Sequence, residues 1–427
     1  MSNKPIDIFL KGFVNSDWTT LIGSDYQDST PSGEISYVLT QSLDSSLYIA
    51  GKVNSTNSYG QDLFVSKFDS DGNRKWSTEF GTEMQLNMLG GREEISEIIT
   101  DKDGSIYVIG NTQGPLNGQS NPSGPNSLYG DYYASAFITK LGVDGEQEWT
   151  KILGSQYYDY ANHIQISSDG YVYVAGTTTP SSPFDGNQDP GPIFLVKFDS
   201  AGIQQWINFF GEDNGSSIND LTLDASGDIY ITGQTFTDFE DQINEGDRSS
   251  DAYISKVDSD GTKEWTILLG PDNDIDGRYS GPHVIGSSLT ISGDGSLYVV
   301  GYTEDDLNGE EHSTGFDGDK YHHVQDLFLS KFNSNGTREW TKLFVDSVSD
   351  GSSLRKAVSS TKLSTDENGS VYLFKEGFSI TKIKSNGEFD LTHSFGRYPS
   401  GFSYTNDILY DFNGSIFITG YTSEDLD

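Results

Sequence analysis

The chain has 427 residues, no cysteine and a formal net charge of −38 at pH 7, from 64 Asp plus Glu against 26 Lys plus Arg. The lack of cysteine excludes disulfides, thiolate zinc sites and cysteine nucleophiles. The negative charge disfavours nucleic acid and anionic membranes as partners, and no apolar run reaches the roughly 18 residues that membrane insertion needs.

In chain order, the first two predicted strands are Asp7–Phe13 and Trp18–Gly23. Units of four predicted strands follow, and one unit is typified by residues 95–100, 106–109, 136–140 and 148–153. Alternating polar and apolar residues in these runs predict strands, and no stretch has the period of an amphipathic helix.

The second strand of each unit belongs to a short phrase that recurs along the chain, and most copies end in glycine. A second phrase follows most copies, running from Asp62 to Trp76 in the first unit and ending at Trp149, Trp206, Trp265 and Trp340 in later ones. The copies of the first phrase are Ser46–Gly51, Ser105–Gly110, Tyr171–Gly176, Asp228–Gly233, Ser296–Gly301, Ser370–Lys375 and Ser415–Gly420. Four antiparallel strands at a period of roughly 40–60 residues predict propeller blades.

The chain ends in the middle of a unit, with predicted strands Asp407–Tyr410 and Ile416–Gly420. Two strands from each end would complete one blade, so we expect a single all-β domain, residues 1–427, folded as a seven-bladed β-propeller. Residues 1–23 and 406–427 would form the closing blade, and residues 24–405 the other six. Phe9 and Phe417 should then lie in one sheet.

Two connections in each unit are tight turns with glycine, such as Asp103-Gly104 and Asp260-Gly261. Glycine supplies the positive φ of a hairpin turn and Asp or Asn caps it, so we expect these carboxylates to be structural. The other two connections are long and irregular. In a propeller they share one face, where we expect function to reside.

The repeated pattern G-x-T-x-x-x-L-[N/D]-G, followed by D-x-[F/Y]-[I/L/V]-x-K, a D-x-x-G turn and Trp, resembles the bacterial SBBP β-propeller repeat over essentially the whole chain. The first part stands at Gly110–Gly118 and Gly301–Gly309. The resemblance implies the fold and an extracellular or cell-surface location, with an export signal outside this segment, and it implies no particular chemistry. The Trp that ends many units also looks like the docking motif of quinoprotein propellers, without their cofactor residues.

Two acidic loops are candidate metal sites. Asp272, Asp274 and Asp276 alternate before Gly277, as at the start of a calcium loop, although His283 stands where an EF-hand would have a bidentate Glu. Asp305, Asp306, Asp317 and Asp319 share the second loop with His312, His322 and His323, so calcium, zinc or another transition metal is possible there. The alternative for both loops is solvated acidic surface.

Five tyrosines are candidate ligand contacts: Tyr132 and Tyr133 in one long connection, and Tyr157, Tyr158 and Tyr160 in the next. Rings beside Asp and Asn are typical of sugar-binding surfaces, and the alternative is that they cover an interface between blades. No catalytic motif is present. We therefore expect a non-enzymatic, calcium-stabilised binding or adhesion module, monomeric as a domain, with a glycan or protein ligand. The alternatives are a polysaccharide lyase or hydrolase acting in the central funnel and a structural spacer.

Overall fold

The computed structural model describes the chain in segments and divides it into two compact units. Unit 1 comprises Met1–Ser182, Lys197–Gln205 and Tyr398–Asp427, and unit 2 comprises Pro183–Val196 and Trp206–Arg397. The described residues are 7–13, 18–22, 38–54, 61–81, 93–122, 133–155, 158–179, 191–211, 215–244, 249–272, 283–312, 325–345, 361–366, 368–375, 379–394, 403–410 and 416–422. Among them, no helix is long and apolar enough to cross a membrane.

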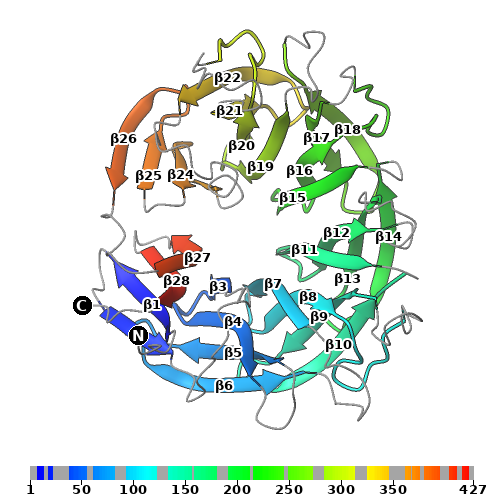
Figure 1. The fold of residues 1–427 in the computed structure, drawn as a ribbon, viewed down its shortest axis with the longest axis vertical. Helices are drawn as coiled ribbons and strands as arrows, with labels where there is room; N and C mark the ends of the chain where they lie inside the picture. The colour runs from blue at the N-terminus through cyan, green and yellow to red at the C-terminus, as the bar shows by residue number, and fades with distance from the viewer. Residues whose placement is uncertain are drawn as a thin grey trace, which may run out of the picture. The chain divides into compact units, whose positions relative to one another are not determined.

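The described strands pair into seven four-stranded sheets (Figure 1). In order of pairing, the sheets are β2 (Trp18–Ile22), β1 (Asp7–Phe13), β28 (Ile416–Thr422), β27 (Ser403–Tyr410); β3 (Val38–Gln41), β4 (Leu47–Asn54), β5 (Gln61–Phe68), β6 (Arg74–Phe80); β10 (Gln147–Leu153), β9 (Ser135–Leu141), β8 (Ile106–Thr112), β7 (Glu93–Thr100); β11 (Asp159–Ile166), β12 (Val172–Thr178), β13 (Ile193–Phe198), β14 (Gln204–Phe210); β15 (Ser216–Leu223), β16 (Ile229–Thr235), β17 (Asp251–Val257), β18 (Lys263–Leu269); β19 (Val284–Ile291), β20 (Leu297–Thr303), β21 (Asp326–Phe332), β22 (Arg338–Val345); and β23 (Lys362–Thr365), β24 (Val371–Lys375), β25 (Ser379–Ile383), β26 (Phe389–Ser394).

One sheet of unit 1 combines strands from both ends of the chain. β1 pairs antiparallel with β28 (Figure 1). In this register Phe9 lies opposite Gly420, and Gly12 lies opposite Phe417. Phe9 and Phe417 therefore share a sheet, as the sequence pattern predicts. Backbone hydrogen bonds between these strands tie the two ends of the polypeptide together.

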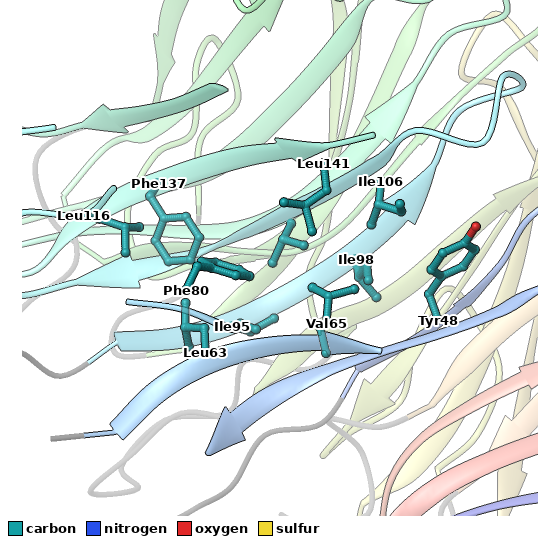
Figure 2. Close-up of a cluster of buried hydrophobic side chains, with 12 residues drawn as sticks. Tyr48, Leu63, Val65, Phe80, Ile95, Ile98, Ile106, Leu116, Phe137 and Leu141 are labelled. Carbon is teal, nitrogen blue, oxygen red and sulfur yellow. The ribbon is translucent and has the colours of Figure 1, made fainter. Parts of the chain in front are cut away.

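The core of unit 1 lies between adjacent sheets. Val65 and Phe80 from the β3–β6 sheet pack against Ile98 and Phe137 from the β7–β10 sheet, in a cluster that also includes Leu116 from the connection after β8 (Figure 2). All residues of β8 and β9 are buried. Middle strands are covered on both faces because a neighbouring sheet packs on each of them.

The first strand of several sheets bulges opposite the glycine that ends the repeated phrase. In unit 2, Ile218 pairs with Gly233, and the register shifts before Asp220 pairs with Thr232. A Cβ on Gly233 would lie 1.9 Å from the backbone oxygen of Ser217. Glycine is therefore required, because the bulge brings the backbones of the two paired strands so close together that no Cβ fits between them.

The repeated Tyr, Lys and Trp form one packed group in each of several sheets, with the two rings tilted or edge to face. In unit 1, Lys140 pairs with Tyr107 on one side and Trp149 on the other, and its Nζ lies 5.6 Å from the Tyr107 ring centroid. Trp149 Nε1 donates a 3.2 Å hydrogen bond to the carbonyl oxygen of Ser200 in the turn after β13. A Cβ on Gly202 in that turn would lie 2.9 Å from the indole. These repeated residues serve packing between sheets.

Candidate functional site

The carboxylates of the tight turns cap backbone amides. Asp101 Oδ1 accepts hydrogen bonds of 2.9 Å from the backbone nitrogens of both Asp103 and Ser105. Asp258 Oδ1 accepts equivalent bonds of 3.0 and 2.8 Å from Asp260 and Thr262. The turn glycines, such as Gly104 with φ +83°, occupy the left-handed region. The turns are structural, as predicted, but their capping carboxylates belong to Asp101 and Asp258, two residues before Asp103 and Asp260. The acidity of these turns therefore does not mark a ligand site.

The first candidate metal loop is described only at Asp272. Its Oδ1 and Oδ2 accept hydrogen bonds of 2.9 and 2.5 Å from the backbone nitrogens of Asn308 and Gly309. Asp274 and Asp276 lie outside the described residues. The Asp272 carboxylate thus holds the turn after β20, and calcium at this loop stays a prediction.

The second candidate loop is also partly described. Asp306 Oδ1 accepts a 2.7 Å bond from the backbone nitrogen of His312, and Asp305 Oδ1 accepts a 2.8 Å bond from that of Asp306. Within the described part of the chain, no three His, Asp or Glu side chains converge as metal ligands would. The remaining predicted members lie outside it: Asp317, Asp319, His322 and His323.

Three of the five predicted tyrosines lie together in unit 1. The rings of Tyr133 and Tyr158 meet edge to face, with centroids 5.1 Å apart and planes at 86°. Tyr158 and Tyr160 lie parallel, with centroids 6.2 Å apart and planes at 4°. All three side chains are partly exposed. Tyr132 and Tyr157 lie outside the described residues.

Backbone hydrogen bonds fix the positions of these rings. The backbone nitrogen of Asp159 donates to the carbonyl oxygen of Ala134 at 2.8 Å, which joins the segment before β9 to the start of β11. The buried Asn121 side chain donates to the carbonyl oxygen of Tyr133 at 3.2 Å. Tyr158 and Thr179 exchange backbone and side-chain bonds. The tyrosines therefore stand on a rigid base, which lowers the entropy lost on binding.

A buried carboxyl group lies between Tyr158 and Tyr160 in the sequence. Asp159 is 3% exposed, and its Oδ2 accepts a 2.5 Å bond from the backbone nitrogen of Ser155. Burial raises the pKa of Asp159 to about 6, although the bond from Ser155 opposes the rise. Burial also raises the pKa of Tyr160 to about 12, with smaller contributions from Tyr158, Glu94 and Asp159. The Tyr160 phenol is therefore protonated near neutral pH and can donate a hydrogen bond.

Lys52 and Glu94 complete the polar surroundings. Lys52 Nζ lies 3.1 Å from Glu94 Oε1, which joins β4 to β7, and the Lys52 side chain is only 8% exposed. Glu93, the neighbour of Glu94 at the start of β7, is buried. Lys52, Glu94 and Asp159 could not be predicted as site residues, because nothing in their local sequence indicates which strands will adjoin.

One sequence interpretation needs correction. Tyr160 was expected in a connection between strands, but β11 begins at Asp159, so Tyr160 is a strand residue paired with Thr177. Residues in the same register of other first strands are Glu94 in β7, Ser217 in β15, Ile285 in β19 and Tyr404 in β27. The repeated fold therefore does not require tyrosine at this position.

Comparison with known families agrees with this architecture. Residues 148–184 match the family model of the SBBP β-propeller repeat. The chain carries an SBBP repeat. The matched segment contains all but the first residue of β10, the whole of β11 and β12, and with them Tyr158 and Tyr160. The SBBP resemblance inferred from the sequence is confirmed.

Similar proteins extend the comparison. The SBBP-repeat chain is 26% identical over 267 residues to the regulatory protein FlaEY of Caulobacter vibrioides, covering 58% of this chain and 26% of that protein. It is 24% identical over 322 residues to the uncharacterized WD repeat-containing protein L264 of Acanthamoeba polyphaga mimivirus, covering 62% and 22%. The chain thus matches about a quarter of each relative's length.

Among solved structures, the WD40 domain of Pan2 from Neurospora crassa is similar, with a TM-score of 0.50 and 11% identity over 100% of this chain and 98% of that one. At this low identity the likeness concerns the fold alone. The protein has an all-β propeller fold built from four-stranded antiparallel sheets.

Proposed function

We propose that this protein is a non-enzymatic binding module whose ligand is a glycan, held by Tyr133, Tyr158 and Tyr160. The observation that carries the proposal is the contact of these three partly exposed rings, which come from the segment before β9 and from the start of β11. The residues that recur from sheet to sheet are used for turns, bulges and packing. The tyrosine cluster is not accounted for by those repeated roles.

The chemistry of the cluster suits a sugar. Flat rings stack on the C–H faces of pyranoses, and phenol hydroxyls exchange hydrogen bonds with sugar hydroxyls. The parallel rings of Tyr158 and Tyr160 would line one side of a bound sugar. The Tyr133 ring, which is perpendicular to that of Tyr158, would contact the sugar through its edge. Such partly exposed aromatic rings contribute contact area at low entropic cost because each has only two side-chain torsions.

A glycan array followed by calorimetric titration tests the proposal. Tyr158→Ala and Tyr160→Ala should each weaken binding about tenfold or more, since each removes a whole aromatic contact. Tyr372→Ala is the matched control, because Tyr372 is also partly exposed but donates its hydroxyl to Asp366 at 3.2 Å within the β23–β26 sheet. Equal binding by all variants, or ligands confined to proteins, would contradict the proposal.

Three further features belong to the same proposal: that the seven sheets close into one seven-bladed ring, that the protein works at the cell surface or outside the cell, and that calcium stabilises the loop at Asp272–Gly277. The pairing of β1 with β28 supports ring closure because it ties the ends of the chain into one sheet. Deleting residues 1–22 should then lower the melting temperature of the whole protein. Melting in which only one sheet is lost would argue against a closed ring.

A further inference from the structure

We infer that the glycan bound at the tyrosine cluster is uncharged. It would be a polymer of neutral hexoses and not one that carries uronate or sulfate groups. The inference rests on the proposed function and adds the chemical class of the ligand. It follows from the charges placed around Tyr133, Tyr158 and Tyr160, which differ in sign from those an anionic sugar would need.

Among the described residues beside the cluster, carboxyl groups outnumber cations. Asp159 lies between Tyr158 and Tyr160 in sequence and is buried, while Glu93 and Glu94 open the adjacent strand β7. Glu94 acts electrostatically on the Tyr160 hydroxyl. Lys52 is the cation of this group, and its Nζ is already 3.1 Å from Glu94 Oε1.

An anionic sugar would therefore lose hydration without gaining an opposite charge. Like charges at a partly desolvated site repel more strongly than in bulk water, because the effective dielectric constant is lower there. The formal net charge of −38 adds a long-range repulsion that slows the approach of polyanions. A neutral sugar avoids both effects.

Neutral hydroxyls, by contrast, find suitable partners. The Tyr160 hydroxyl has a pKa of about 12, raised chiefly by burial, and so keeps its proton as a donor. The phenol oxygens can accept hydrogen bonds from sugar hydroxyls, and a carboxylate-bearing sugar has fewer hydroxyls to offer. Specificity would thus arise from repulsion of anions together with hydrogen bonds to hydroxyls.

The test compares neutral glucan, mannan and galactan hexasaccharides with their C6-carboxylated counterparts, which share the same backbone and differ in charge. We expect each neutral oligosaccharide that binds to bind at least about tenfold more tightly than its carboxylated form at low salt. The difference should shrink as salt screens the repulsion. Tyr160→Ala should weaken the neutral interaction, which assigns it to the cluster.

Two substitutions test whether the repulsion of anionic sugars comes from the tyrosine cluster or from the overall charge. Glu94→Gln removes a negative charge and releases Lys52 from its ion pair, so it should strengthen binding of the carboxylated oligosaccharides about fivefold and leave the neutral ones nearly unchanged. Glu148→Gln is the control. Glu148 also pairs with a lysine, Lys140 at 2.8 Å. Lys140 lies near the end of β9, whereas Tyr133 precedes the start of that strand, so the length of β9 separates Glu148 from the cluster.

The outcomes are distinguishable. If carboxylated oligosaccharides bind as tightly as neutral ones, and Tyr160→Ala weakens both, the inference about charge is wrong while the glycan function stands. If no oligosaccharide of either kind binds, the proposed function itself is contradicted. Equal effects of Glu94→Gln and Glu148→Gln would also overturn the inference, because the repulsion would then come from the overall charge and not from this site.

Discussion

The Asp220 carboxylate accepts a 2.6 Å hydrogen bond from Ser288 Oγ, linking β15 to β19 in unit 2. The same Oδ2 accepts a 2.9 Å bond from the backbone nitrogen of Leu289. Asp220 directly follows the bulge of its strand. In unit 1 the same link recurs at 2.9 Å, from the backbone nitrogen of Ile164 to Glu97 Oε2 and from that of Leu39 to Asp407 Oδ2. An acidic side chain after the bulge thus joins the first strands of adjacent sheets.

Replacing Asp220 should therefore destabilise the protein. Asp220→Ala leaves the backbone N–H of Leu289 without its acceptor, which should cost about 1–3 kcal/mol of unfolding free energy. Thermal and urea unfolding would measure the loss. Asp260→Ala, at an exposed turn position, should change stability by less than about 0.5 kcal/mol. Similar losses of stability in both variants would mean that the hydrogen bonds between the first strands of adjacent sheets do not stabilise the protein.

The glycine opposite the bulge should tolerate no side chain. Gly233→Ala places a Cβ 1.9 Å from the backbone oxygen of Ser217, and backbone cannot move aside as a side-chain tip can. We expect a loss of about 3 kcal/mol in urea unfolding. Gly293→Ala is the control, since nothing lies within 4 Å of its added Cβ. A Gly233→Ala protein as stable as the Gly293→Ala protein would show that the close approach does not exist.

The indole nitrogens of Trp149 and Trp265 should contribute differently to the stability of the protein. Trp149→Phe removes the 3.2 Å bond to Ser200 and should cost about 1 kcal/mol more than Trp265→Phe. The buried Nε1 of Trp265 has no hydrogen-bond partner among the described residues, so its loss removes no bond seen there. Paired thermal melts decide the order. The reverse order would contradict the contact made by Trp149.

The buried carboxyl group of Asp159 should make the stability of the protein depend on pH. Its folded pKa of about 6 lies above the ordinary aspartate value of 3.8, so folding favours the protonated form. The contribution of Asp159 to stability is therefore greatest below about pH 4 and declines as pH rises through 6, by up to about 3 kcal/mol. Asp159→Asn should remove this decline and make the protein more stable than wild type at pH 7.5.

Urea unfolding of both proteins between pH 4 and 8 measures that difference. At pH 4 the two should have nearly the same stability, because the wild-type carboxyl is then neutral as well. Parallel pH profiles for wild type and Asp159→Asn would show that the carboxyl is not desolvated.

Calcium at Asp272, Asp274 and Asp276 predicts stabilisation by mass action. At a free calcium concentration of 100 times the dissociation constant, the folded state should gain about 2.7 kcal/mol, which a chelator would abolish. Asp274→Asn with Asp276→Asn should remove the calcium response without disturbing the bonds from Asp272 to Asn308 and Gly309. Melting curves that do not respond to calcium or to the chelator would exclude the site.

The strands, the turns and their repetition could be predicted from local patterns in the amino-acid sequence. Glycine at 104 and 261, the paired phrases and the split unit at the two ends are local signals, and local backbone preferences with period-2 patterning suffice to interpret them. They predicted even the pairing of β1 with β28, because two incomplete units can be matched by counting.

Which side chains come into contact could be learned from the tertiary structure alone. Tyr133 reaches Tyr158 across two strands and a turn, and Lys52 reaches Glu94 from another sheet. The burial that raises the pKa of Asp159 likewise depends on neighbours distant in sequence. Local pattern carries no information on such contacts, because they are set by how sheets pack and not by the preferences of any one segment.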